Sequence, residues 1–195
     1  MTMPGTEFGI RLHGRGGQGV VTAAELLSVA AFYDGHEAQA IPSFGSERMG
    51  APVTAFCRVS DRPIRVREPI AAPDAVVIVD ATLLRHIDVF SGLVPDGFVL
   101  VNSTRSAAAL GLVPLDQLRN PAHLVTVAAT DLARLHVGRP LPNVCLLGAF
   151  AALTGLVTLA SIEKATAERF NPEVAAANFA AAEAGYRAVA EAVHA

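Results

Sequence analysis

His13-Gly14-Arg15-Gly16-Gly17-Gln18-Gly19 lies between a short apolar run, residues 8–12, and a helix-favouring stretch, residues 20–32. Four glycines among six residues cannot stabilise a helix or a strand, because glycine loses the most backbone entropy on ordering. Their use is steric, since a chain without Cβ atoms turns tightly and brings its N–H groups close to a bulky anion. The helix that follows adds the positive end of its dipole. The pattern predicts a strand, a tight turn and a helix whose N-terminus can bind a phosphate.

Three of these glycines formally satisfy the G-x-G-x-x-G pattern of dinucleotide-binding units. Such a unit also needs an acidic residue at the end of its second strand, about twenty residues further on, to hold the ribose hydroxyls. The corresponding strand ends at Ala40-Ile41-Pro42-Ser43, which contains no carboxylate. Asp34 and Glu37 lie before or at its beginning and belong to the opposite edge. We therefore predict a phosphate cradle rather than a nicotinamide site, with a purely structural turn as the alternative.

The composition is that of an α/β protein whose sheet is covered, or of a subunit partly hidden by partners. Of the 195 residues, 52% are hydrophobic and only 17% are charged, and the net charge is −3. A small monomer usually carries more charge. Lys164 is the only lysine, and no basic block is interleaved with aromatic residues. Nucleic-acid binding is not expected.

Cysteine and histidine show no metal-binding pattern. Cys57 and Cys145 are 88 residues apart, and the six histidines have no ligand spacing. We expect two buried free thiols in a reducing cytoplasm, and no iron–sulfur cluster or zinc site in this chain. Residues 1–5 lack the basic start and apolar core of a signal peptide. No Ser/His/Asp arrangement is present either, so no catalytic and no metal-ligating residue is predicted.

One stretch imitates a membrane span, because residues 140–162 contain no charge. Its length nearly suffices. Pro140, Pro142 and Asn143 at its start, and the absence of a flanking positive cluster, argue against a span. We predict a helix buried on all sides within the protein core.

The chain as a whole predicts an α/β fold: an open, mostly parallel, doubly wound sheet with an inserted β-hairpin and a C-terminal helical section. We expect one domain over residues 1–195, with helices from about residue 143 packed on it. The hairpin is predicted from residues 52–59 and 64–67, which alternate on either side of a turn at residues 60–63. Continuous apolar runs predict the buried parallel strands, and the remaining patterns predict the helices. The other predicted strands are 9–13, 37–41, 75–79, 98–101 and 124–128, and the helices 17–33, 82–90, a short one near residue 130, 143–159, 161–169 and 172–193.

Polar residues follow several of these strands directly. They include the glycine loop, residues 42–50, residues 80–82, Asn102-Ser103 and Thr130-Asp131. In open α/β sheets, ligands bind beyond the carboxyl ends of the strands. We therefore expect these groups to meet at one edge of the sheet and to form the site.

Two glycine-bounded motifs carry a family resemblance. Gly14-Arg15-Gly16-Gly17-Gln18-Gly19 and Ser43-Phe44-Gly45-Ser46-Glu47-Arg48-Met49-Gly50 together resemble the γ subunit of the 2-oxoacid:acceptor (ferredoxin) oxidoreductases. Further matching pieces are residues 59–64, 72–75, 143–149, Asn178 and residues 184–186. The family often has two glycines after the arginine, whereas this chain continues Met49-Gly50-Ala51-Pro52.

The resemblance implies a role within a larger complex that converts a 2-oxoacid to its acyl-CoA. Thiamine diphosphate and Mg²⁺ are expected mainly on the α and β subunits, and [4Fe-4S] clusters on a ferredoxin-like δ subunit. An NAD- or flavin-linked subunit is a further partner in some such complexes. This chain is expected to contribute coenzyme A binding and assembly, without catalytic residues of its own. Pyruvate, 2-ketoisovalerate, indolepyruvate and arylglyoxylates such as phenylglyoxylate all remain open as substrates, as do ferredoxin and NAD as acceptors.

The predicted cofactor-binding residues form three groups. The first holds the phosphate or pyrophosphate of coenzyme A, the second faces the ligand from the second motif, and the third is placed by its strand ends against the adenosine or pantetheine. The first group is Gly14, Arg15, Gly16, Gly17, Gln18 and Gly19. The second group is Ser43, Phe44, Ser46 and Arg48, and the third is Asn102 and Thr130. Each also has a structural reading, as turn, cap, salt bridge or solvated charge. Two other functions stay open: a purely structural assembly subunit, and a free-standing Rossmann-like nucleotide-binding oxidoreductase.

Overall fold

The computed structural model describes residues 7–42 and 49–194. Their centre is a six-stranded sheet of order β2-β3-β1-β4-β5-β6. β1, β4, β5 and β6 run parallel, whereas β3 is antiparallel to both β1 and β2. The strands are β1 (Glu7–Arg15), β2 (Glu37–Pro42), β3 (Pro52–Ser60), β4 (Ala75–Ile78), β5 (Phe98–Asn102) and β6 (Leu124–Val127). The predicted α/β class and the mostly parallel sheet are confirmed.

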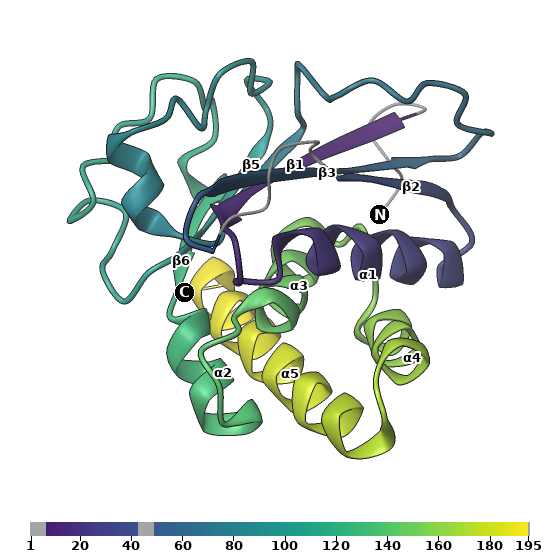
Figure 1. The fold of residues 1–195 in the computed structure, drawn as a ribbon. Coiled ribbons are helices and arrows are strands. Elements are labelled where there is room, and N and C mark those ends of the chain that lie inside the picture. Colours follow the sequence, from purple (N-terminus) through teal and green to yellow (C-terminus); the bar gives the residue numbers. More distant parts are fainter. Residues whose placement is uncertain (1–6, 43–48, 195) are drawn as a thin grey trace.

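The five α-helices lie together on one side of the sheet (Figure 1). The other side carries the short 3-10 helix η1 (Ala81–Arg85) and irregular segments. The sheet is thus covered on both faces, but α-helices form only one of the two layers expected of a doubly wound sheet. The connections after β4 and β5 contain Pro and Gly turns and no long amphipathic stretch, which explains the difference. The helices are α1 (Val20–Tyr33), α2 (Ala129–Val137), α3 (Asn143–Thr154), α4 (Leu159–Arg169) and α5 (Pro172–His194), with a second 3-10 turn, η2 (Pro121–His123).

The inserted antiparallel hairpin is formed by β2 and β3, not by residues 52–59 and 64–67. β3 has β1 on one side and β2 on the other, so it offers no free edge to residues 64–67. That segment instead contacts Arg58, whose Nη1 donates to the carbonyl of Val66 at 2.9 Å. Ile70 then packs with Ile41 and Phe56. The alternating pattern of residues 64–67 therefore did not mark a strand. The segment instead provides a backbone carbonyl acceptor for the buried Arg58 side chain.

The uncharged stretch contains the buried helix α3, as predicted, although this helix ends at Thr154 rather than at the predicted residue 159. Every residue of α3 except Ala152 is buried. Across residues 7–42 and 49–194, none of the helices is both long and apolar enough to cross a membrane. α3 packs closely on α5, since a Cβ added to Gly148 would lie 1.9 Å from the carbonyl oxygen of Ala182. A Cβ at Gly185 would likewise lie 2.3 Å from the carbonyl oxygen of Cys145, so the two glycines allow the two backbones to approach.

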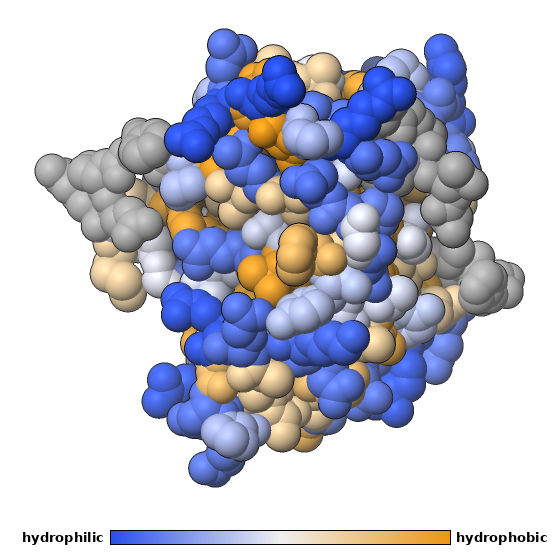
Figure 2. Space-filling view, turned by 90° about the vertical axis from the view of Figure 1, so that its right-hand side faces the viewer, coloured by the Kyte–Doolittle hydropathy of each residue, from blue (hydrophilic) through white to orange (hydrophobic). Residues whose placement is uncertain are grey.

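Exposed large hydrophobic side chains are scattered over the described surface. Phe32, Met49, Val113 and Leu135 are each more than half exposed and come from different parts of the chain. The face in Figure 2 shows small orange areas separated by blue ones, rather than one continuous apolar patch. The described residues on that face therefore do not by themselves mark a large apolar docking surface.

Candidate functional site

The glycine loop is joined to the beginning of β3. β1 extends through Arg15, beyond the predicted end at residue 13, because Gly14 and Arg15 pair with Val53 and Pro52. The Gly16 N–H donates to the carbonyl of Ala51 at 2.9 Å, and Gly16 accepts from the Gly50 N–H at 3.1 Å. The two loops of the sequence prediction thus approach each other at this edge, at the residues where the second one is described.

Two glycines of the loop have conformations that require glycine. Gly17 and Gly19 have φ values of 92° and 72°, in the left-handed region that L side chains rarely adopt. These turns delay the helix to Val20, three residues after the predicted start. Gly14 has a different reason, because a Cβ there would lie 2.5 Å from Cγ2 of Val20. Gly14 therefore allows β1 and α1 to pack.

A cavity of about 800 Å³ opens at the N-terminus of α1. Its wall comes from the glycine loop, the first turn of α1, the connection between α2 and α3, and the beginning of α5. Of the predicted site residues, Arg15, Gly16, Gly17 and Gly19 line it. Gly19 caps α1 without a side-chain hydrogen bond, so the first N–H groups of the helix have no side-chain acceptor. Such a helix end favours an anion.

Asn143 is the residue of this cavity that most directly points to a ligand. It is only 6% exposed, yet its side-chain amide has no hydrogen-bond partner among the described residues. It lies against Gly19, since a Cβ on that glycine would be 2.5 Å from Asn143 Nδ2. α3 also begins here, with Pro142 as its N-cap and no side-chain cap. Two helix N-termini and one free amide therefore meet at the same cavity.

Other cavity residues come from the C-terminal third of the chain, which the prediction used for packing and, at residues 143–149 and Asn178, for the family resemblance. Arg139 is exposed and forms no ion pair within the described part of the chain. Phe170 is half-buried and adds an aromatic ring, while Glu173 adds the one carboxylate of the wall. Arg139 could have been suspected from its place in the loop before the uncharged stretch. Asn143 could not, because an asparagine at a helix start usually serves as a cap.

Arg15 and Gln18 are held by neighbouring protein groups. Gln18 Oε1 accepts from the Arg15 backbone N–H at 2.7 Å, and Gln18 Nε2 donates to Asp80 Oδ2 at 2.8 Å. Arg15 lies 3.3 Å from the same carboxylate oxygen and donates to Thr82 Oγ1 at 2.9 Å. Burial of Asp80 opposes its ionisation, but hydrogen bonds from Thr82 and Gln18 and the charge of Arg15 outweigh it and lower the pKa. The network joins the carboxyl ends of β1 and β4.

Asn102 and Thr130 come together, but outside the cavity wall. Asn102 Nδ2 donates to the carbonyl of Val79 and to Thr130 Oγ1, both at 2.8 Å. The Thr130 N–H donates back to Asn102 Oδ1 at 3.1 Å. These bonds tie the ends of β4 and β5 to the beginning of α2. The predicted residues Ser43, Phe44, Ser46 and Arg48 lie outside the described residues.

The strand order also bears on the dinucleotide alternative. In a dinucleotide-binding unit the second strand lies beside the first, which brings its terminal carboxylate to the ribose. Here the antiparallel β3 occupies that position, and β2 is one strand further out. β2 and β3 lie on one side of β1, whereas β4, β5 and β6 lie on the other, so the strand order reverses between β1 and β4. At this point the Arg15–Asp80 network occupies the edge formed by the carboxyl ends of the strands. This arrangement does not fit a nicotinamide dinucleotide at the glycine loop.

The comparisons with known proteins agree with one family. Residues 9–188 match the family described as pyruvate ferredoxin/flavodoxin oxidoreductase. The pyruvate synthase subunit PorC of Methanosarcina barkeri is 51% identical over 156 residues, which are 80% of this chain and 82% of that protein. The common γ subunit of the pyruvate/ketoisovalerate oxidoreductases of Pyrococcus abyssi is 47% identical over 174 residues, 89% and 92% of the two chains.

Solved structures share the fold. The crystal structure of the pyruvate oxidoreductase subunit PORC of Thermotoga maritima has a TM-score of 0.80 at 38% identity, over 94% of this chain and 97% of that one. 2-Oxoglutarate:ferredoxin oxidoreductase of Magnetococcus marinus has a TM-score of 0.73 at 17% identity, over 96% of this chain but 32% of that one, and shows the fold alone. Fold and matches define an α/β subunit of an oxidoreductase. The chain belongs to the pyruvate ferredoxin/flavodoxin oxidoreductase family, as a γ-type subunit.

Proposed function

We propose that this chain supplies coenzyme A-binding groups to a multisubunit complex that oxidatively decarboxylates a 2-oxoacid to its acyl-CoA, and that it contributes to assembly. The observation that carries the proposal is the cavity beside Gly19. Two helices begin there without side-chain caps, and the amide of Asn143 lines the cavity with no hydrogen-bond partner among the described residues. Because this amide lines the cavity, a polar ligand bound there can replace water as its hydrogen-bond partner.

The cavity wall matches the chemistry of coenzyme A. Helix N–H groups and the Arg139 guanidinium favour the phosphates. The Asn143 amide both donates and accepts, as the adenine edge and the pantetheine amides require. The half-buried ring of Phe170 offers a face to the adenine. The Magnetococcus marinus enzyme was solved with coenzyme A and succinyl-CoA bound, and this fold forms about a third of its chain.

The remaining cofactors are assigned to partner subunits. Thiamine diphosphate and Mg²⁺ belong to the α and β subunits in this proposal, and the [4Fe-4S] clusters to a ferredoxin-like δ subunit. The described residues do not fit a cluster or metal site, since none of their His, Cys, Asp and Glu side chains form a group of three or more. Burial raises the pKa of the Cys57 and Cys145 thiols to about 12, which makes both poor ligands. The names of the relatives favour pyruvate or ketoisovalerate as the oxoacid. The description of the family favours ferredoxin or flavodoxin as the acceptor.

Arg139→Gln and Asn143→Ala test the assignment in the assembled complex. We expect each to raise the KM for coenzyme A at least tenfold, since a hydrogen bond to a charged group is worth ~1.5–3 kcal/mol, a ligand group left without its partner costs a similar amount, and about 1.4 kcal/mol is a factor of ten. Reduction of the acceptor by the 2-oxoacid in a single turnover without coenzyme A is expected to stay at the wild-type rate. Steady-state kinetics and stopped-flow absorbance measure the two quantities.

Arg187→Gln is the matched control, because Arg187 is exposed on α5 and does not line this cavity. Size-exclusion chromatography of each complex establishes that assembly is intact. An unchanged KM for coenzyme A in both cavity variants, with intact complexes, would contradict the proposal. That result would favour the alternative of a purely structural subunit.

A further inference from the structure

A second cavity, of about 660 Å³, lies on the other side of the Arg15–Asp80 network. It opens beyond the carboxyl ends of β4 and β5, between η1 and the segment that follows β5. Arg15 lines the first cavity and Thr82 lines the second, and the hydrogen bond from Arg15 Nη2 to Thr82 Oγ1 separates them. The two cavities therefore have different walls and can be tested independently.

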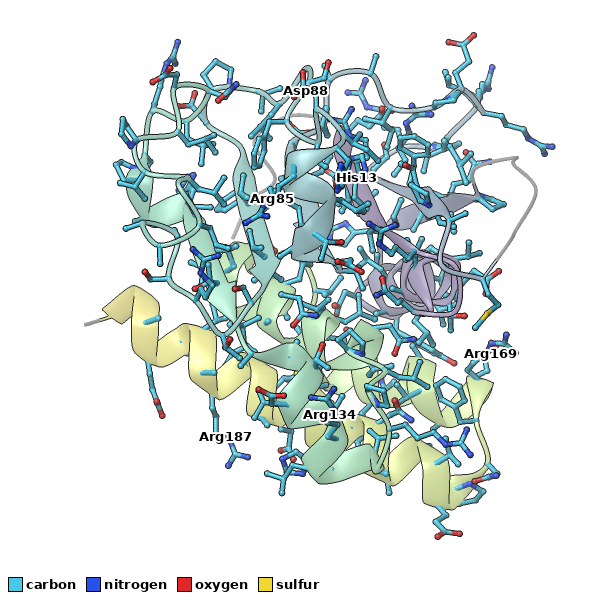
Figure 3. The ribbon with its side chains drawn as sticks, turned by 60° about the vertical axis from the view of Figure 1, so that its left-hand side comes forward. His13, Arg85, Asp88, Arg134, Arg169 and Arg187 are labelled. Carbon is cyan, nitrogen blue, oxygen red and sulfur yellow. The ribbon has the colours of Figure 1, made fainter. Side chains whose placement is uncertain are left out.

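The rim of the second cavity is cationic. Arg85 and Arg105 both lie on it, together with His86 and the hydroxyl of Ser103. Arg85 has no hydrogen bond or ion pair with any described residue, and the Arg105 guanidinium contacts only the carbonyl of Ala109. Figure 3 shows Arg85, the last residue of η1, at the sheet edge, and Arg187 on the outer side of α5. No carboxylate of the described chain neutralises the two rim guanidinium groups.

The nearby carboxylates are engaged elsewhere. Asp80 accepts hydrogen bonds from Gln18 and Thr82 and pairs with Arg15. Asp88 acts on the buried Arg11, whose pKa is lowered by burial and partly restored by this charge. The positive rim is thus a local excess in a chain whose net charge is −3.

The floor of the second cavity is apolar. Leu84 and Leu110 are half-buried and Leu112 is buried, and all three face this space. A concave apolar floor with a few convergent polar groups is the usual form of a small-molecule site, and the volume lies within the range of about 300–1,000 Å³. An apolar floor discriminates against a bare inorganic ion, whereas a guanidinium rim favours a planar or tetrahedral oxyanion.

We propose that this second cavity binds a small amphiphilic anion, in which an apolar group of the size of an aromatic ring carries one phosphate or carboxylate. The apolar group packs on Leu84, Leu110 and Leu112, and the oxyanion accepts from Arg85 and Arg105. The proposal is independent of coenzyme A binding, because it uses none of the residues of the first cavity.

Saturation-transfer NMR on the full-length chain tests the proposal with four probes. Phenyl phosphate and benzoate carry the two oxyanions on one ring, benzyl alcohol is the neutral analogue, and inorganic phosphate lacks the apolar group. We expect signals from the two aryl anions and none from benzyl alcohol. Inorganic phosphate has no carbon-bound protons to detect, so it is added as a competitor and is expected to leave the aryl anion signals unchanged. The stronger aryl anion identifies the oxyanion that the rim prefers. Equal signals from benzyl alcohol would overturn the role of the rim.

Variants locate the bound probe. Arg85→Gln and Arg105→Gln are each expected to weaken binding of the stronger aryl anion at least tenfold, whereas Arg187→Gln and Arg139→Gln leave its Kd unchanged. Excess coenzyme A is expected not to displace it. Displacement by coenzyme A together with a loss in Arg139→Gln would place the probe in the first cavity and overturn the proposal. Absence of any signal from both aryl anions would also overturn it, without bearing on the KM for coenzyme A.

Discussion

Gly148→Ala is expected to lower the free energy of unfolding by about 3 kcal/mol, because overpacking a well-packed contact costs typically 1–3 kcal/mol and here the obstacle is backbone. The added methyl group would lie 1.9 Å from the Ala182 carbonyl oxygen and 2.5 Å from its carbon. Side-chain rotation cannot relieve that clash, so α3 and α5 must separate. Helix propensity alone predicts the opposite sign, a gain of roughly 0.8–1 kcal/mol for alanine over glycine.

Urea unfolding followed by circular dichroism measures this difference. Gly138→Ala is the matched control: Gly138 has a φ of 73° but no atom within 4 Å of an added Cβ. It should lose only the cost of a left-handed alanine, about 1 kcal/mol. A Gly148→Ala protein as stable as the wild type would show that α3 and α5 are not packed as closely as described.

Acid is expected to destabilise the protein through His13. Burial, and secondarily the charge of Arg11, lowers the pKa of His13 from 6.5 to about 4. The unfolded chain binds a proton at this residue near pH 6.5, whereas the folded chain resists it until about pH 4. Above pH 6.5 the imidazole is neutral in both the folded and the unfolded chain, so it does not lower the free energy of unfolding. As the pH drops from 6.5 to about 4, only the unfolded chain takes up the proton, and the free energy of unfolding falls. A difference of about 2.5 pKa units corresponds to about 3 kcal/mol.

The structural basis is the position of His13 on β1. Its ring is 5% exposed, Nδ1 lies 3.4 Å from Thr54 Oγ1, and Nε2 is buried without a hydrogen-bond partner among the described residues. Figure 3 shows it within the body of the protein. Nε2 therefore has no acceptor that could stabilise the protonated ring.

Urea unfolding at pH 7, 6, 5 and 4 checks this expectation. In His13→Gln the difference in unfolding free energy between pH 7 and pH 4 should be smaller than in the wild type by about 3 kcal/mol. Asp80, whose pKa is also lowered in the folded protein, contributes equally to both proteins and cancels. His86→Gln, at an exposed position, serves as the control. Equal pH dependence in His13→Gln and the wild type would refute the assignment.

Local sequence patterns predicted the parts of the fold that depend on neighbouring residues. The apolar runs became the buried strands β4 and β5, and the uncharged stretch became the buried helix α3. The glycine loop was correctly placed between a strand and a helix, although its left-handed glycines delay α1 to Val20. The hairpin partner was wrong, because alternation shows that a segment can be a strand but not which neighbour it pairs with.

The candidate site divides in the same way. The glycines, the tight turn that they form and the family motifs were readable from sequence, because backbone conformation at Gly17 and Gly19 depends on the residue itself. Whether Arg15 faces a ligand was not readable, since Asp80 and Thr82, more than sixty residues away, decide its contacts. The sequence also did not reveal that the Asn143 amide lacks a partner, because packing between distant segments places this side chain against Gly19.

The sequence by itself thus determined the family, the α/β class and the strand–loop–helix unit that begins the chain. Only the tertiary structure decided that β3 lies between β1 and β2, that α-helices cover one face, and that Asn143, Arg139 and Phe170 complete the cavity. The physical reason is range. Backbone preference and hydrophobic periodicity act over a few residues, whereas strand order and cavity walls arise from contacts between segments far apart in the chain.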